Sequence, residues 1–317
     1  MKNNDHNVLL KVLSWLKNKE EVFLFTVIQT WGSSPCPPGS LLAISENGKF
    51  TGSVSGGCVE QDLIDKVKSG SFKQATCVEN YGLSAAETRK YGLPCGGKLV
   101  ILVERKLDYS QFETILEKLQ KRQSVNRQTC LSTLHTSLQP TQSTEFSYKD
   151  NIVNKVYGPL WRLIIIGAGQ LSSLVSDLAI LLDYDTYICD PRENYQYNWN
   201  DSSTKVITSM PDDTILKLNP DSKTAIVALT HDPKLDDMGL LEALQSEAFY
   251  IGALGSRKST IERRKRLLSL GLNSPQVNRL HGPIGLDIGS KTLAEISVSI
   301  MAEITATRNN LKLVLEP

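Results

Sequence analysis

The first half of the chain mixes apolar positions at helical spacing with short apolar runs typical of strands. Helices are predicted at 5–17, 58–68, 85–91 and 111–122. Strands are predicted at 21–29, 41–45, 49–54, 72–79 and 98–104, and Asn47-Gly48 predicts a hairpin turn between two of them. The polar segment 124–150, rich in Ser, Thr and Gln, predicts edge strands and loops. This order predicts a mixed α+β domain.

The pattern changes after Gly158-Pro159, a dipeptide typical of a boundary. Short β-rich runs at 162–166, 186–189, 224–229 and 248–251 alternate with helical stretches at 170–182, 236–247 and 256–270. A capping box, Thr292 to Glu295, opens a last helix that ends near Arg308. Alternating strands and helices predict a doubly wound parallel sheet with helices on both faces. The sequence therefore predicts two domains, 1–157 and 158–317.

The first strand of the second domain leads into the turn Gly167-Ala168-Gly169. Gly167 permits a sharp turn, Gly169 lets a pyrophosphate approach the backbone, and the next helix begins with free N–H groups. Asp190 ends the next strand, where an acid can bind a ribose hydroxyl, although nearby Arg192 suits a phosphate instead. The alternative is that Asp190-Pro191 is only a turn. The set predicts a Rossmann-type domain that binds a nucleotide, NAD(P) among the candidates.

Glycine-rich loops of the first half, at 30–40, 52–60 and 93–97, are the other candidate ligand contacts. Ser55-Gly56-Gly57 leads directly into a helix, whose dipole stabilises the Cys58 thiolate as a ligand for a soft metal or sulfur. The alternatives are that Cys58 is a small buried hydrophobe and Glu60 an ordinary first-turn acid. The predicted contacts in these loops are Ser33, Ser34, Ser55, Gly56, Gly57, Cys58, Glu60, Cys95 and Gly96.

Polar turns in the second half follow predicted strands, beyond whose carboxyl ends ligands bind in doubly wound sheets. His231 follows one strand, Arg257 opens the helix after the next, and His281 begins a glycine-rich loop before the last helix. The histidines can serve as acid, base or hydrogen-bonding group. The alternative is that they only satisfy backbone groups of their loops.

Composition narrows the classes of function. Lys and Arg number 35 and Asp and Glu 34, a net charge of +1, so nucleic-acid binding has no support. The sequence contains neither the run of about 18 apolar residues needed for a membrane span nor the order of a signal peptide. We therefore expect a cytoplasmic protein with reduced thiols, and none of its six cysteines forms a CxxC pair.

Long motifs in these loops resemble the XdhC/CoxI family. They cover nearly the whole chain in order, although Cys36 and Gln170 stand where a basic residue and a histidine are expected. The motifs are Trp31-Gly32-Ser33-Ser34-Pro35, Pro37-Pro38-Gly39, Gly52-Ser53-Val54-Ser55-Gly56-Gly57-Cys58-Val59-Glu60, Gly92-Leu93-Pro94-Cys95-Gly96-Gly97, Thr230-His231-Asp232-Pro233, Tyr250-Ile251-Gly252-Ala253-Leu254-Gly255-Ser256-Arg257 and His281-Gly282-Pro283-Ile284-Gly285-Leu286-Asp287-Ile288-Gly289.

The resemblance implies an XdhC/CoxI domain followed by a Rossmann domain, in an accessory protein for molybdenum hydroxylases such as xanthine dehydrogenase. It implies that the protein binds the molybdenum cofactor (molybdopterin), aids its sulfuration with a cysteine desulfurase and delivers it to the apo-hydroxylase. A homodimer is compatible with the sequence. Two alternatives stay open: an NAD(P)-dependent oxidoreductase, and a scaffold whose nucleotide site is vestigial.

Overall fold

The computed structural model describes residues 4–31, 36–57, 59–82, 98–141, 145–199 and 204–311. The chain divides into two compact units, one of Asn3–Pro159 and one of Leu160–Pro317 with the first two residues. The helix predicted at 85–91 lies outside the described residues.

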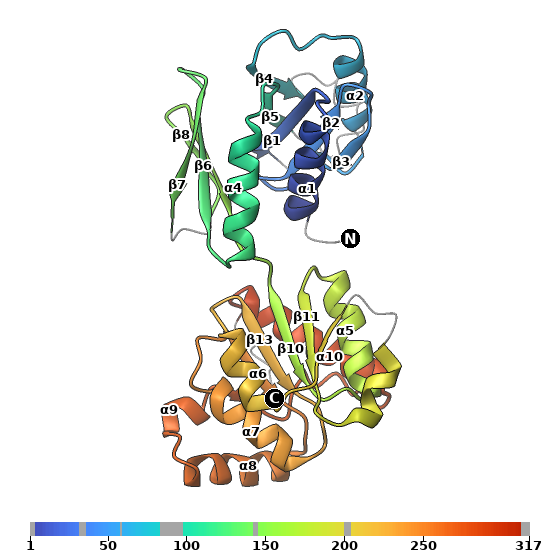
Figure 1. The fold of residues 1–317 in the computed structure, drawn as a ribbon, viewed down its shortest axis with the longest axis vertical. Coiled ribbons are helices and arrows are strands. Elements are labelled where there is room, and N and C mark those ends of the chain that lie inside the picture. Colours follow the sequence, from blue (N-terminus) through green and yellow to red (C-terminus); the bar gives the residue numbers. More distant parts are fainter. Residues whose placement is uncertain are drawn as a thin grey trace. The chain divides into compact units, whose positions relative to one another are not determined.

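The N-terminal unit is built on an antiparallel sheet of five strands (Figure 1). Their order is β3 (Phe50–Gly52), β2 (Leu41–Ser45), β1 (Val22–Trp31), β5 (Lys98–Glu104) and β4 (Thr76–Tyr81). Helices α1 (Asn4–Lys17) and α4 (Tyr109–Gln120) pack on one face, and α2 (Glu60–Lys68) packs on the other. The predicted mixed α+β fold is therefore confirmed.

The polar segment predicted as edge strands and loops belongs to a second antiparallel sheet, of four strands. Its order is β7 (His135–Pro140), β6 (Val125–Cys130), β9 (Ile152–Tyr157) and β8 (Ser147–Lys149). Alternate residues of β6 are buried, and buried Arg127 forms a bidentate ion pair with Glu104 of β5, at 2.8 and 3.0 Å. Polar side chains thus form part of this interior, which explains why the segment does not look like a core from its sequence.

The C-terminal unit contains a six-stranded sheet in which every neighbouring pair is parallel. The order is β12 (Lys205–Ile207), β11 (Asp185–Cys189), β10 (Arg162–Ile166), β13 (Thr224–Ala228), β14 (Tyr250–Ala253) and β15 (Leu280–His281). This is the 3-2-1-4-5-6 order of a Rossmann fold, which places a ligand crevice where β10 meets β13. The predicted doubly wound sheet is confirmed.

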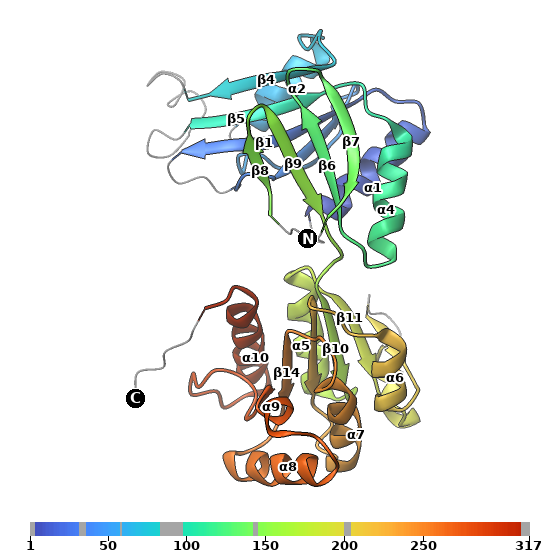
Figure 2. The same cartoon turned by 90° about the vertical axis from the view of Figure 1, so that its left-hand side faces the viewer.

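Helices cover both faces of this sheet (Figure 2). In β10, Leu163 and Ile165 face α5 (Gln170–Leu181) and α10 (Leu293–Arg308). Ile164 and Ile166 point the other way, toward α6 (Pro211–Leu218), α7 (Pro233–Ala243), α8 (Arg257–Ser269) and α9 (Ser274–Val277). No described helix is long and apolar enough to cross a membrane.

Two local predictions can be compared directly with the structure. The capping box of α10 is present, with the Glu295 N–H bonded to the Thr292 hydroxyl at 3.2 Å and the reciprocal bond at 2.9 Å. The helix predicted from residue 58 begins at Glu60 instead, because the loop before it folds around the Glu60 side chain.

Candidate functional site

The carboxylate of Glu60 organises the glycine loop of the N-terminal unit. Glu60 opens α2, is 6% exposed, and accepts hydrogen bonds from the loop that precedes it. The donors are the hydroxyls of Ser53 (2.6 Å) and Ser55 (2.5 Å) and the backbone N–H groups of Val54 (3.0 Å), Ser55 (3.0 Å), Gly57 (3.0 Å) and Val59 (3.2 Å).

These bonds determine the charge of Glu60. Burial raises its pKa, but the hydrogen bonds from Ser53, Ser55 and the loop backbone outweigh burial and lower the pKa to about 2. The sequence suggests that the loop exposes backbone N–H groups that could bind an anionic ligand. In the structure these N–H groups donate to the Glu60 carboxylate instead. Glu60 was predicted as a cofactor contact; in the structure its carboxylate lies inside the loop and bonds to the loop itself.

The outer side of this loop is open. Gly57 has a φ of +121°, and a methyl group placed on it would meet no atom within 4 Å. The first glycine-rich loop reaches the same place, since Cys36 Sγ lies 3.7 Å from the Ser53 hydroxyl. Five predicted contacts, Ser33, Ser34, Cys58, Cys95 and Gly96, lie outside the described residues. The structure thus brings Ser55, Gly56, Gly57 and Glu60 together.

The glycine turn of the C-terminal unit has the features a phosphate site requires. Gly167 has a φ of +108°, and a Cβ there would come within 3.0 Å of the Thr230 backbone. Gly169 caps α5 without a side-chain hydrogen bond, and the space above it is open. The buried Ser172 hydroxyl in the first turn has no hydrogen-bond partner in the described part of the chain. The turn and helix therefore fit a phosphate group.

Asp190 does not present a free carboxylate to that turn. It is 0% exposed; Oδ2 accepts from the Ala168 N–H (2.8 Å) and from Arg192 Nη2 (2.7 Å), and Oδ1 accepts from Arg192 Nε (2.9 Å). Burial raises the pKa of Asp190, but the bonds from Arg192 and Ala168 lower it overall. Arg192 in turn lies over the Tyr195 ring at 4.1 Å. A ribose contact at Asp190 would require these bonds to break.

His231 lies beside the glycine turn on a strained loop. It is exposed and has a φ of +62°. The hydroxyl of its neighbour Thr230 closes the loop: it accepts from the Asp232 N–H (2.9 Å) and donates to the Asp236 carboxylate (2.7 Å). Since Thr230 also packs against Gly167, the His231 loop and the turn are held together.

A buried ionic network continues from this loop to the next one. Arg263 of α8 bonds to Asp236 (2.9 Å), to Asp237 (3.1 Å) and to the Leu254 carbonyl after β14 (3.0 Å). Burial raises the pKa of Asp236, more than Thr230 and Arg263 lower it. This network was not predicted from the sequence, because its members lie on different elements and only the fold brings them together.

Arg257 is exposed in the first turn of α8. That helix end is capped internally, since Ser259 donates its N–H to the Ser256 hydroxyl at 3.1 Å, and the Ser259 hydroxyl accepts from the Ser256 N–H at 2.7 Å. Further along α8, Arg266 bonds to Asp237 at 2.7 Å. Some basic residues of α8 therefore pair with acids of the same chain, while Arg257 is exposed.

His281 is held by residues that were not predicted. Its Nδ1 lies 2.9 Å from Glu303 Oε1 of α10, and its ring centroid lies 4.4 Å from that of Tyr250. Glu303 also accepts from the Tyr250 hydroxyl (2.6 Å) and the Gly285 N–H (2.7 Å). Burial raises the pKa of Glu303, but the bonds from His281, Tyr250 and Gly285 lower it overall. One feature of the sequence could have indicated Glu303: it is an acid that stands between the buried residues Ile300 and Ile304 of α10.

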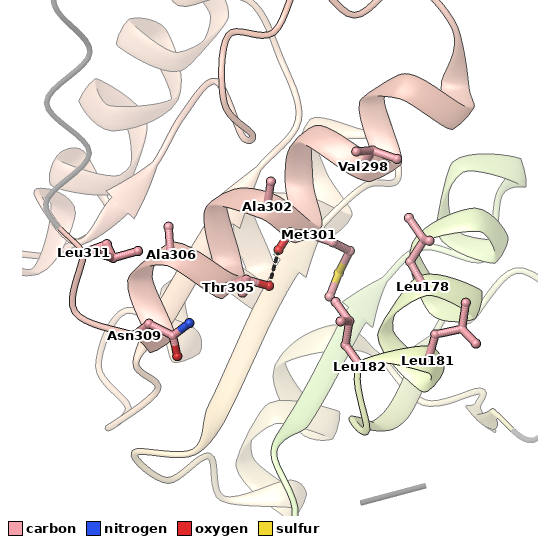
Figure 3. Close-up of a pocket in the computed structure, with 10 residues that line it drawn as sticks. All are labelled: Leu178, Leu181, Leu182, Val298, Met301, Ala302, Thr305, Ala306, Asn309 and Leu311. Atoms are coloured by element: carbon pink, nitrogen blue, oxygen red, sulfur yellow. Dashed lines mark hydrogen bonds between the residues drawn. The ribbon is translucent and has the colours of Figure 1, made fainter. Parts of the chain in front are cut away.

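An apolar pocket of about 560 Å³ lies between α5 and α10 (Figure 3). Its lining is aliphatic apart from Thr305, which bonds to the Met301 carbonyl at 2.7 Å, and Asn309. None of the predicted site residues is among those that line it, which are Leu178, Leu181, Leu182, Val298, Met301, Ala302, Thr305, Ala306, Asn309 and Leu311.

Comparison with known proteins agrees with this architecture. The profile of the XdhC and CoxI family matches residues 15–82, and that of the XdhC Rossmann domain matches residues 163–304. The molybdenum cofactor insertion chaperone PaoD of Escherichia coli is 24% identical, over 96% of this chain and 89% of its own. A probable xanthine dehydrogenase subunit of Bacillus subtilis is 26% identical, over 94% and 97%.

A solved structure extends the likeness to three dimensions. A crystal structure described as a xanthine dehydrogenase from Bacillus halodurans superposes with a TM-score of 0.77 at 25% identity, covering 98% of each chain. The likeness thus spans both units, and each unit carries one of the two matched sequence signatures. The chain belongs to the XdhC/CoxI family.

Proposed function

We propose that this protein is a maturation factor that binds the molybdenum cofactor, supports its sulfuration and delivers it to a molybdenum hydroxylase of the xanthine dehydrogenase type. The observation that carries the proposal is the loop built around Glu60, which lies inside the region matched by the family profile. The full-length likeness to a molybdenum cofactor insertion chaperone supports the same role.

Each half of the chain offers proposed contacts of its own. In residues 1–157, Cys58 and Cys95 are proposed as soft ligands for sulfur or metal, and Ser33, Ser34, Ser55, Gly56, Gly57 and Gly96 as loop contacts. In residues 158–317, Gly167 and Gly169 are the proposed contacts of a phosphate group, which fits the open space over Gly169 and the uncapped α5. His231, Arg257 and His281 complete the proposed contacts. When bound, the cofactor supplies the metal–sulfur centre that the client hydroxylase needs.

Glu60 acts on this process through the loop rather than by contact. The residues before and after Cys58, Gly57 and Val59, both donate to the Glu60 carboxylate. Both neighbours of Cys58 in the sequence are therefore held by the same carboxylate. We propose Glu60 as a positioning residue for the Cys58 loop.

The test begins with the full chain co-expressed with cofactor synthesis and purified without oxygen. We expect pterin, measured by fluorescence after oxidation, and molybdenum, measured by elemental analysis. Cys58→Ala should lower the pterin content while the thermal transition stays unchanged, and Cys130→Ala, in the β6–β7 region, serves as the matched control. Wild-type protein without pterin would contradict the proposal.

Delivery and partners need separate measurements. Loaded protein added to a purified apo-hydroxylase should restore its activity, and a cysteine desulfurase added beforehand should increase the sulfurated fraction. Light scattering tests the proposed homodimer. Restoration of activity by free cofactor at the same rate would remove delivery from the proposal.

An NAD(P)-dependent oxidoreductase is the second candidate, favoured by the strand order and the glycine turn. The engagement of Asp190 by Arg192 and Ala168 weighs against the usual ribose contact. Calorimetric titration with NAD and NADP distinguishes the two functions. Tight binding of either, together with turnover of a substrate, would replace the maturation role.

A further inference from the structure

Among the described residues, His281 has a hydrogen-bond partner at Nδ1 but none at Nε2. Nδ1 faces the Glu303 carboxylate at 2.9 Å, and Glu303 carries a lowered pKa, so it is an anion that can only accept. A neutral histidine beside it must therefore carry its proton on Nδ1. Nε2 then bears a lone pair and becomes a hydrogen-bond acceptor.

Glu303 is fixed firmly enough to impose this tautomer. Its Oε2 accepts from the Tyr250 hydroxyl at 2.6 Å and from the Gly285 N–H at 2.7 Å, while Oε1 faces His281. The Glu303 side chain is 15% exposed, and Tyr250 is 1% exposed. These bonds tie α10, β14 and the loop after β15 to one carboxylate, so neither its position nor its charge depends on a ligand.

The histidine itself remains accessible. Its side chain is 33% exposed, although Tyr250 covers one side of the ring. Nε2 has no hydrogen-bond partner within the described ranges of the chain. Because the ring is partly exposed, Nε2 can bond to water and can exchange that water for a donor of a ligand.

We propose that His281 contacts the cofactor through Nε2, accepting a hydrogen bond from an N–H group of the pterin ring, and that Glu303 is the positioning residue that holds the proton of the neutral ring on Nδ1. This inference rests on the proposed function, because it names the part of the cofactor that this loop meets. The ring and amino N–H groups of a pterin are the donors that such an acceptor requires.

The first measurement is the tautomer of His281 in the full chain without cofactor. Long-range ¹H–¹⁵N correlation spectra, recorded in a pH series that extends to the neutral ring, report which nitrogen carries the proton. Only four histidines are present, and His281→Asn identifies the signal. We expect the Nδ1–H form in the wild type and in Tyr250→Phe, and a shift to the Nε2–H form in Glu303→Ala. Where Glu303→Ala does not fold, Glu303→Gln takes its place, with a mixture of tautomers expected.

The second measurement is pterin retained after anaerobic co-purification. His281→Ala and Glu303→Ala should each weaken retention by about tenfold, the effect of one lost hydrogen bond to a ligand. Tyr250→Phe is the matched control, because it removes a donor to Glu303 but leaves the His281 bond; its retention should stay within about twofold of the wild type.

Each result decides between outcomes. An Nε2–H tautomer in the wild type, or full retention by His281→Ala, would overturn the inference. Equal losses in Tyr250→Phe and Glu303→Ala would also overturn it, since they indicate a structural tie only. Absence of pterin from the wild type overturns the proposed function itself, and this failure is recognisable before any variant is made.

Discussion

The two units each place a carboxylate beside a glycine loop, but they stabilise it differently. Glu60 receives only neutral donors, two hydroxyls and several backbone N–H groups. Asp190 receives two backbone N–H groups, from Ala168 and Arg192, and the Arg192 guanidinium. The carboxylate of Glu60 therefore organises its loop without a countercharge, whereas the carboxylate of Asp190 depends on an ion pair.

This difference shows what each loop can offer a ligand. Around Glu60 the backbone N–H groups are used internally, so an anion has few donors left there. At the glycine turn only the Ala168 N–H is used by the acid, while the first turn of α5 stays uncapped. A phosphate is therefore expected in the C-terminal unit and not inside the Glu60 loop.

The largest expected effect comes from Glu60→Gln. An amide presents N–H groups to loop donors and leaves buried groups unsatisfied, so the N-terminal unit should lose about 3 kcal/mol of stability. Urea denaturation of the full chain measures this loss. Asp65→Asn, an exposed acid on the same helix, should change stability by less than about 0.5 kcal/mol. Equal effects of the two variants would contradict the role given to Glu60.

The next largest effect is expected from acid, which should remove the stability that the Glu60 carboxylate supplies. The pKa of Glu60 is about 2 in the folded chain against an ordinary value of 4.5, so its contribution is complete above pH 4.5 and is lost as the pH falls toward 2. The loss amounts to roughly 3 kcal/mol. Stability followed between these pH values should fall in the wild type and fall much less in Glu60→Gln. Parallel curves would show that other groups cause the acid sensitivity.

Removing Arg192 is expected to have a smaller effect. Arg192→Met leaves the buried Asp190 charge with two backbone donors, the N–H groups of Ala168 and of residue 192, and about 2 kcal/mol of stability should be lost. The Arg192 side chain is 30% exposed, which keeps the loss below that of a fully buried pair. Thermal denaturation measures it. Adding Asp190→Asn to Arg192→Met should restore most of the stability. If it does not, the loss is not caused by the unpaired charge of Asp190.

The smallest effects distinguish the two glycines of the turn. Gly167→Ala forces a φ of +108° on an alanine and brings its Cβ to 3.0 Å from Thr230, so about 1–2 kcal/mol should be lost. Gly169→Ala has a φ of −77° and open space, so its cost should be under about 0.5 kcal/mol. It should still weaken pterin retention by filling that space. Equal stability losses would show that the turn is not held as described.

Local patterns predicted much of the fold. The strands at 41–45 and 98–104 have the predicted bounds, and the alternation after Gly158-Pro159 predicted the parallel sheet. The second sheet was harder to foresee, because its interior includes Arg127, whose partner Glu104 lies on another strand. A polar residue in β6 is buried only because that partner is present.

The candidate site was predictable by position but not by role. The glycines, Asp190 and Glu60 were identified, yet their bonding depends on how each loop folds back on itself. Glu303 was missed because its bond to His281 joins residues on separate elements. Such a pair forms because α10 packs against the sheet, and the spacing of residues in the sequence does not predict this packing.

The backbone of Ala168, the middle residue of the glycine turn, is held at both its N–H and its carbonyl. The Ala168 N–H bonds to Asp190, and its carbonyl accepts from the indole of Trp199, at the end of the 3-10 helix η2 (Glu193–Trp199), at 3.2 Å. Trp199 is 7% exposed and is one of four tryptophans. Any ligand that shifts this residue must alter the electronic environment of the indole. The turn thus carries its own optical reporter, and the emission of a protein in which the other tryptophans are replaced by phenylalanine would record occupancy in real time.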